Sequence, residues 1–220
     1  MGGFGTFFII LAVILVLFGA VFFVRGFLKA QKKNALLSRN RLDRKTIFEY
    51  LRTEFSEKNV FCGYLFPFPK NKQGFVSRYA PIDAVVITAG GVAVIDIQNF
   101  DAQIDSASAD RWVIRRGDQI TEIASPVRQN EVYKKVINDL LRARGIHNVP
   151  VYSIVVYTGN ADFTVPYDNL VSAREMIGLL SALHTERILT VSDLLMIRRI
   201  LSENKNTKSE ADAALKKIYG

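Results

Sequence analysis

The sequence predicts an α/β protein in which a mixed β-sheet is flanked by helices in three layers, behind one N-terminal transmembrane helix. Apolar runs of about seven residues, rich in Val and Ile, alternate with segments whose apolar residues recur at helical spacing. These runs are apolar on both faces, as expected for strands that are covered by helices on each side. A long uncharged run near the N-terminus predicts the membrane helix.

The first 25 residues predict a membrane anchor. Phe7–Val24 contains no charged residue, and residues 4–24 together reach the ~20 residues that a helix needs to cross the hydrocarbon of a bilayer. A cleaved signal peptide is the alternative, and it requires positive charge before the apolar run. Here residues 1–6 carry no charged side chain, and the basic residues follow the run. We therefore expect an uncleaved anchor over residues 1–25.

The basic residues that follow predict the orientation of the anchor. Residues 26–45 form a basic juxtamembrane segment, and outside the first 45 residues the chain carries only one unit of the formal net charge of +8. Basic residues next to a membrane span stay on the cytoplasmic side. We expect a single-pass protein of the cell membrane with its N-terminus outside. Residues 4–24 would contact lipid, and residues 25–45 would contact anionic headgroups.

Composition limits the function of the remaining chain. Residues 46–203 are long enough for one domain with a hydrophobic core, and residues 204–220 predict a C-terminal tail helix. The single cysteine, Cys62, cannot form a disulfide within the chain and lies in an apolar run that predicts burial. The two histidines, His147 and His184, are isolated in sequence, which excludes a zinc site of the Cys/His type.

In the first half of the domain, apolar spacing predicts a helix over Asp43–Phe55 and a strand over Val60–Phe66. A loop rich in Pro and Gly follows over Pro67–Gly74. Two further strands, Ile82–Thr88 and Gly91–Gln98, are separated by a glycine-containing turn and predict a β-hairpin.

In the second half, a hairpin precedes a helix with a Ser–Pro start, and buried strands then alternate with helices. The predicted strands are Trp112–Arg116, Gln119–Ile123, Val151–Thr158 and Asn169–Ala173; the predicted helices are Ser125 to a stop near Gly145, Arg174–Leu183, Val191–Glu203 and Ser209–Tyr219.

Three polar residues of the first hairpin share one face. Asp83, Asp96 and Gln98 do so because side chains alternate along a strand. If the turn centres on Ala89–Gly90, Asp83 lies opposite Asp96; if it centres on Gly90–Gly91, Asp83 lies opposite Gln98. A three-residue loop would break this parity. Opposite side chains have Cβ atoms ~5 Å apart.

Two carboxylates at that separation repel each other unless positive charge lies between them. A divalent cation with oxygen ligands is the usual solution, and a turn cap or ion-pair partner is the plainer interpretation of such aspartates. From the residues alone, both readings stay open for Asp83 and Asp96.

The same residues carry a resemblance to a known family. The stretch PIDAVVITAGGVAVIDIQNFDAQI, followed by Trp112, the helix start SPVRQN and the strand VYSIVVYTG, resembles the NERD family, the nuclease-related domain. The resemblance spans about Phe48 to Leu201. It implies a restriction-endonuclease-like fold of the PD-(D/E)xK superfamily, with a four-stranded mixed sheet flanked by helices. It also implies Mg²⁺ or Mn²⁺ as the cofactor and nucleic acid as the partner.

Carried over to this sequence, the resemblance makes Asp83 and Asp96 the two metal-binding acids. Gln98 takes the position of the catalytic lysine, which is the main departure from the family pattern. Gln129 and Tyr133 match a Gln-x-x-x-Tyr signature on one helix face.

Further parts of the site stay open. Glu49 or Glu54 could supply a helical acid, and Arg115 or Arg116 could replace the charge of the missing lysine. A glutamine keeps hydrogen-bond donors but has no charge and no titratable proton.

Three functions are therefore predicted as alternatives. The first is a membrane-tethered, metal-dependent nuclease that cleaves DNA at the cytoplasmic face. The second is a degenerate nuclease domain that binds nucleic acid or a protein without hydrolysis. The third, a purely structural anchor for other membrane components, has no positive feature in the sequence. The oligomeric state is not predicted.

Overall fold

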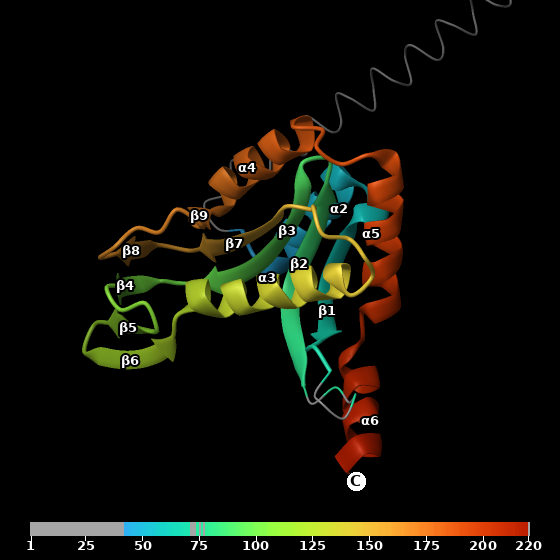
Figure 1. Ribbon diagram of the computed structural model, residues 1–220. Helices are drawn as coiled ribbons and strands as arrows, with labels where there is room; N and C mark the ends of the chain where they lie inside the picture. Colours follow the sequence, from blue (N-terminus) through green and yellow to red (C-terminus); the bar gives the residue numbers. More distant parts are fainter. Residues whose placement is uncertain (1–41, 71–73, 75, 77, 220) are drawn as a thin grey trace, which may run out of the picture. The chain divides into compact units, whose positions relative to one another are not determined.

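Five strands form a mixed sheet at the centre of the fold (Figure 1). The computed structural model describes residues 42–70, 74, 76 and 78–219. The strand order is β1-β2-β3-β7-β9, with β1 to β3 antiparallel and β3, β7 and β9 parallel. The bounds are β1 (Val60–Pro67), β2 (Tyr79–Thr88), β3 (Gly91–Asn99), β7 (Val151–Thr158) and β9 (Leu170–Ser172).

Helices cover both faces of this sheet, which confirms the predicted mixed α/β architecture. On one face, α3 and α5 pack on β2 and β3. On the other, α2 and α4 contact the same sheet and meet through the rings of Phe55 and His184. The bounds are α2 (Arg44–Phe55), η1 (Glu57–Asn59), α3 (Pro126–Arg142), α4 (Ala173–Thr185), α5 (Val191–Asn204) and α6 (Lys208–Tyr219).

The predicted two-sided burial of the central strands is confirmed. Val85 and Val94 belong to the core under α3 and α5. Their neighbours Val86 and Ile95 point the opposite way and are fully buried as well. Cys62 is buried as predicted. The sheet therefore holds residues of β2 and β3 rigidly between two helical layers.

The predicted helix starts are also confirmed. Asp43 caps α2 by accepting from the N–H of Thr46, and Ser125 caps α3 ahead of Pro126. Capping boxes begin α4 at Ser172 and α5 at Thr190. These caps satisfy backbone N–H groups that a helix leaves without a partner in its first turn.

The prediction of a single sheet is wrong, because four strands form a second one. Its order is β6-β5-β4-β8, and the predicted hairpin is present as β5 and β6. The sequence pattern does not predict β4 or β8, which have four and three residues. Strands this short carry too little periodicity to be recognised. The bounds are β4 (Ala102–Asp105), β5 (Arg111–Arg116), β6 (Gln119–Ala124) and β8 (Ala161–Phe163).

The second sheet continues the parallel pair β3–β7 across a break in the ladder. β4 follows β3, β8 follows β7, and β4 pairs with β8 in parallel. At the break Gly159 has a φ of 87°, and a Cβ there would collide with the carbonyl oxygen of Phe100. Only glycine combines this φ with such a close approach. Gly159 is thus required where the two sheets join.

An aromatic core supports the second sheet. Trp112 is fully buried and packs against the rings of Phe100, Phe163 and Tyr167. The same core includes Val155 of β7, so the second sheet is packed onto the end of the first.

The predicted anchor over residues 1–25 and nearly all of the basic segment lie outside the described residues. Within the part of the chain that the structure describes, no helix is long and apolar enough to cross a bilayer. The loop predicted over Pro67–Gly74 also falls partly outside it.

Candidate functional site

The hairpin register places Asp83 opposite Asp96. Thr88 pairs with Gly91 and Ala84 with Ile95, so the turn centres on Ala89–Gly90 and the next position outward joins the two aspartates. Of the alternatives that the sequence left open, this is the one that brings the carboxylates together. The turn lies against α4, and a Cβ at Gly90 would collide with the carbonyl oxygen of Leu183.

Asp83 sits where the ladder between β2 and β3 ends. Its Oδ2 accepts from the backbone N–H of Ile97 at 2.8 Å. The Nη2 of Arg44, in the first turn of α2, donates to the carbonyl oxygen of Ile97 at 3.0 Å and lies 3.2 Å from Asp83 Oδ2. Asp83 and Arg44 therefore satisfy both backbone groups of Ile97, which β2 no longer reaches.

The two carboxyl groups interact directly. Burial is the largest influence on the pKa of each group, and their mutual interaction adds a smaller effect that lowers the pKa of Asp83 and raises the pKa of Asp96. Burial raises the pKa of Asp83 above its usual value, against the Ile97 N–H and the Arg44 guanidinium. Burial raises the pKa of Asp96 to about 6, against a hydrogen bond from Gln98, and the charge of Asp83 adds to the rise. Two carboxylates with raised pKa values are typical of a functional site.

Gln98 lies on the same face and is bonded to the pair. Its Nε2 donates to Asp96 Oδ2 at 2.7 Å. The predicted grouping of Asp83, Asp96 and Gln98 is thus present in the fold. Gly63 of β1 is the register neighbour of Asp83 on its other side, and the space where its Cβ would stand is open. The absence of a side chain at Gly63 leaves that side of Asp83 unobstructed.

The helix signature also meets the site. Gln129 Nε2 donates to the Tyr133 hydroxyl at 2.6 Å. Tyr133 is buried, which raises its pKa, and the charges of Asp96 and Asp83 raise it further. Tyr133 therefore lies within electrostatic reach of both carboxyl groups, whereas Gln129 is exposed and is bonded to Tyr133.

Asn130 positions this helix and is not among the residues predicted for the site. It is fully buried, and its Nδ2 lies within hydrogen-bond distance of Val94 O, Ser153 Oγ and Ile154 O on β3 and β7. Its spacing from Tyr133 and Ile137 is helical, so a polar residue on the apolar face of α3 was the available signal.

Arg44 is the second residue that was missed, because it was counted with the basic segment. Positive charge in the first turn of a helix opposes the helix dipole. Its position there, directly after the cap Asp43, was the signal that it needs a partner elsewhere.

The other candidates lie away from the pair. Glu49 is exposed on α2, and Glu54 acts on Tyr50, whose pKa rises to about 12 mainly through burial. Arg115 and Arg116 belong to β5 in the second sheet. The positive charge next to Asp83 comes from Arg44 instead.

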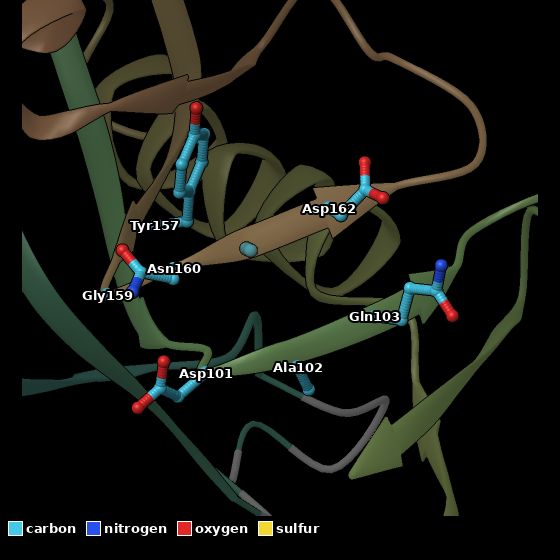
Figure 2. Close-up of a pocket in the computed structure, with 8 residues that line it drawn as sticks. Asp101, Ala102, Gln103, Tyr157, Gly159, Asn160 and Asp162 are labelled. Carbon is cyan, nitrogen blue, oxygen red and sulfur yellow. The ribbon is translucent and has the colours of Figure 1, made fainter. Parts of the chain in front are cut away.

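An open cavity of about 580 Å³ lies at the junction of the two sheets (Figure 2). Tyr157, which pairs with Gln98 across β3 and β7, forms part of its wall. Figure 2 shows the side chains of Asp101, Asn160 and Asp162 around the same space.

The residues present fit a hard divalent cation. Asp83 and Asp96 supply adjacent carboxylate oxygens, and the Ile97 carbonyl lies within reach of the same guanidinium as Asp83. Oxygen donors of this kind suit Mg²⁺ or Mn²⁺. Within residues 42–70, 74, 76 and 78–219, no group of three or more His, Cys, Asp or Glu side chains gathers as a metal site, so any such ion would have two carboxylate ligands and further ligands from backbone, water or substrate.

Comparison with protein families identifies the family of the chain. The model of the NERD family, described as nuclease-related domain, matches residues 39–158, which is just over half of the chain. This range contains α2, the hairpin with Asp83 and Asp96, and α3. No match is found among curated proteins or among solved structures.

Proposed function

The chain belongs to the NERD (nuclease-related domain) family, and on that premise we propose that it is a membrane-tethered nuclease that hydrolyses DNA with Mg²⁺ or Mn²⁺. The observation that carries the proposal is the placement of Asp83, Asp96 and Gln98 on one face, directly beyond the end of the β2–β3 ladder. An aspartate that serves only as the ion-pair partner of an arginine does not need a second carboxyl group beside it. Two acidic side chains on neighbouring strand positions of one face offer the oxygen ligands that a divalent cation uses.

In this proposal Asp83 and Asp96 hold the ion. When bound, it supplies positive charge against the phosphate and makes a water molecule more acidic. Gln98 fixes the orientation of Asp96 through one amide hydrogen. Its second hydrogen and its carbonyl oxygen remain to orient the attacking water. Tyr133 closes the site on the α3 side.

The cavity beside Gln98 supports nucleic acid as the substrate. Its volume of about 580 Å³ is in the range of small-molecule sites, and Tyr157 offers an aromatic ring. Asp101 and Asp162 repel phosphate, but carboxylate and amide groups pair well with base edges. We propose that an unpaired base next to the scissile phosphate enters here.

Membrane tethering remains part of the proposal. Residues 4–24 would span the bilayer and residues 25–45 would meet anionic lipid, which keeps the nuclease at the cytoplasmic face. Protease protection in sealed vesicles, with cleavage sites placed at either end of the chain, tests this orientation. In vesicles whose outer face corresponds to the outside of the cell, we expect added protease to cut the N-terminal site and to leave the C-terminal site intact.

A second function is favoured by Gln98. A neutral amide cannot supply the charge of a lysine, so the domain could bind nucleic acid or protein without hydrolysis. Removal of one transition-state partner lowers a rate by ~10²–10³. This alternative is a degenerate nuclease domain that serves as a tethered binding module.

Nuclease assays separate the two functions. The purified full chain in detergent is incubated with linear and plasmid DNA and Mn²⁺, beside Asp96→Ala, Gln98→Lys and the exposed control Asp212→Ala. Cleavage by wild type and control that Asp96→Ala abolishes supports the enzyme. Cleavage by Gln98→Lys alone identifies a degenerate site. Folded protein without cleavage in any variant refutes the nuclease and leaves the binding module.

A further inference from the structure

We propose that Arg44 is an internal cation that occupies the metal-binding oxygens of this site, so that a divalent ion binds only when Arg44 withdraws. The inference rests on the proposed function, because it concerns the same two carboxylates. It adds a regulatory contact that neither the family match nor the hairpin geometry assigns.

Arg44 occupies oxygen atoms that a metal ion would use as ligands. Asp83 Oδ2 accepts from the Ile97 N–H at 2.8 Å and lies 3.2 Å from Arg44 Nη2. A carboxylate oxygen has two lone pairs, and these two contacts use both. Arg44 Nη2 also donates to Ile97 O at 3.0 Å. Arg44 therefore takes lone pairs on the two oxygens nearest to it, which an ion would otherwise use.

The positive charge of Arg44 also opposes the binding of a metal ion. Arg44 brings the positive charge of a guanidinium to the site. A divalent ion bound to Asp83 would lie within a few ångströms of it, and like charges at that distance repel strongly at a partly buried site. Arg44 thus lowers the affinity for the ion in two ways, by taking oxygen lone pairs and by repulsion.

Of the two partners in this ion pair, Arg44 is the one whose side chain can move away. The side chain of Asp83 is only 16% exposed and is fixed by the Ile97 amide, whereas the side chain of Arg44 is 56% exposed. Arg44 is the first residue of α2, where a positive side chain gains nothing from the helix dipole. Its long side chain can turn to solvent without moving the helix. Asp83 stays in place while Arg44 leaves.

The test measures Mn²⁺ affinity without DNA, so it does not depend on catalysis. Full chains in detergent are stripped with EDTA and titrated with Mn²⁺, with free ion followed by electron paramagnetic resonance. Arg44→Gln removes the charge but keeps an amide donor, and Arg44→Lys keeps the charge. Lys45→Gln removes the same charge from the exposed neighbouring residue of α2. Asp96→Asn gives the background.

We expect Arg44→Gln to bind Mn²⁺ at least tenfold more tightly than wild type and Lys45→Gln, with Arg44→Lys within threefold of wild type. Equal affinities for wild type and Arg44→Gln, both above the Asp96→Asn background, would overturn the role of Arg44 and leave the metal site intact. Binding at background level in every chain would overturn both this inference and the metal-dependent nuclease.

A second measurement keeps the inference testable if Arg44→Gln fails to fold. In wild-type protein labelled with ¹⁵N-arginine, the side-chain Nε–H resonance that is missing from Arg44→Lys identifies Arg44. Saturating Mg²⁺ should shift this resonance toward that of a solvated arginine. An unchanged resonance while Mg²⁺ binds would show that Arg44 does not withdraw, and the inference would fail.

Discussion

Replacement of Asp96 by asparagine should stabilise the metal-free protein at neutral pH. Burial raises the pKa of Asp96 from 3.8 to about 6, so the folded state holds the proton more tightly than the unfolded state does. The resulting stability is fully present below pH ~4 and is lost as the pH rises through ~6. At pH 7.5 the folded wild type therefore carries a costly ionised carboxyl group.

The magnitude follows from the shift. Each pKa unit corresponds to ~1.4 kcal/mol, and a shift of about two units sets an upper bound of ~3 kcal/mol. Asp96 is only partly buried, and Asp83 takes up some of the change when its neighbour becomes neutral. We therefore expect Asp96→Asn to raise the free energy of unfolding at pH 7.5 by ~1–2 kcal/mol. At pH 4 the gain should vanish.

Urea unfolding in EDTA at pH 4, 5.5 and 7.5 measures this difference. Trp112 is the single tryptophan of the chain and is fully buried, so its fluorescence reports unfolding. The control is Asp212→Asn, an exposed aspartate of α6. If Asp96→Asn is less stable than wild type at pH 7.5, or if the difference between them does not grow with pH, then ionisation of Asp96 does not cost the folded protein the free energy that we infer.

Three further predictions concern the frame of the site. Gly90→Ala should destabilise the protein by ~1–3 kcal/mol, because the added Cβ would meet the backbone of α4 at Leu183. Its control is Gly178→Ala, at an exposed position of α4 with open space around it, which should stabilise the protein by ~0.5–1 kcal/mol. If urea unfolding shows a change of the same sign for both variants, this steric explanation is wrong. Asn130→Ala should cost ~2–4 kcal/mol, because it removes the contacts that hold α3 on β3 and β7, and a loss below ~1 kcal/mol would show that they are dispensable. Thr190→Ala should lower the free energy of unfolding by ~1 kcal/mol, because it removes the capping box of α5. Thr190→Ser should retain most of the wild-type stability. An unchanged thermal midpoint in Thr190→Ala would show that the cap does not contribute.

The sequence by itself determined the face on which the candidate site lies. Alternation along two strands is a local property, and with a two-residue turn it predicts Asp83, Asp96 and Gln98 on one face. The register of the fold then decided that Asp83 lies opposite Asp96 and not opposite Gln98. Helix caps such as Ser125 are local as well, and they placed Tyr133 on a helix beginning at the right residue. The family resemblance, now confirmed by the match to residues 39–158, rests on the same local patterns.

Tertiary structure alone decided which groups complete the site. Arg44 reaches the Ile97 carbonyl across 53 residues of sequence, and Asn130 reaches Val94 across 36. The short strand β8 pairs with β4 beyond the break at Gly159, and β4 pairs with β5 on its other side. The pairing of β4 with β8 joins segments distant in sequence, and no periodicity within three or four residues encodes it. The charge that faces the carboxyl pair was therefore decided by packing, not by spacing along the chain.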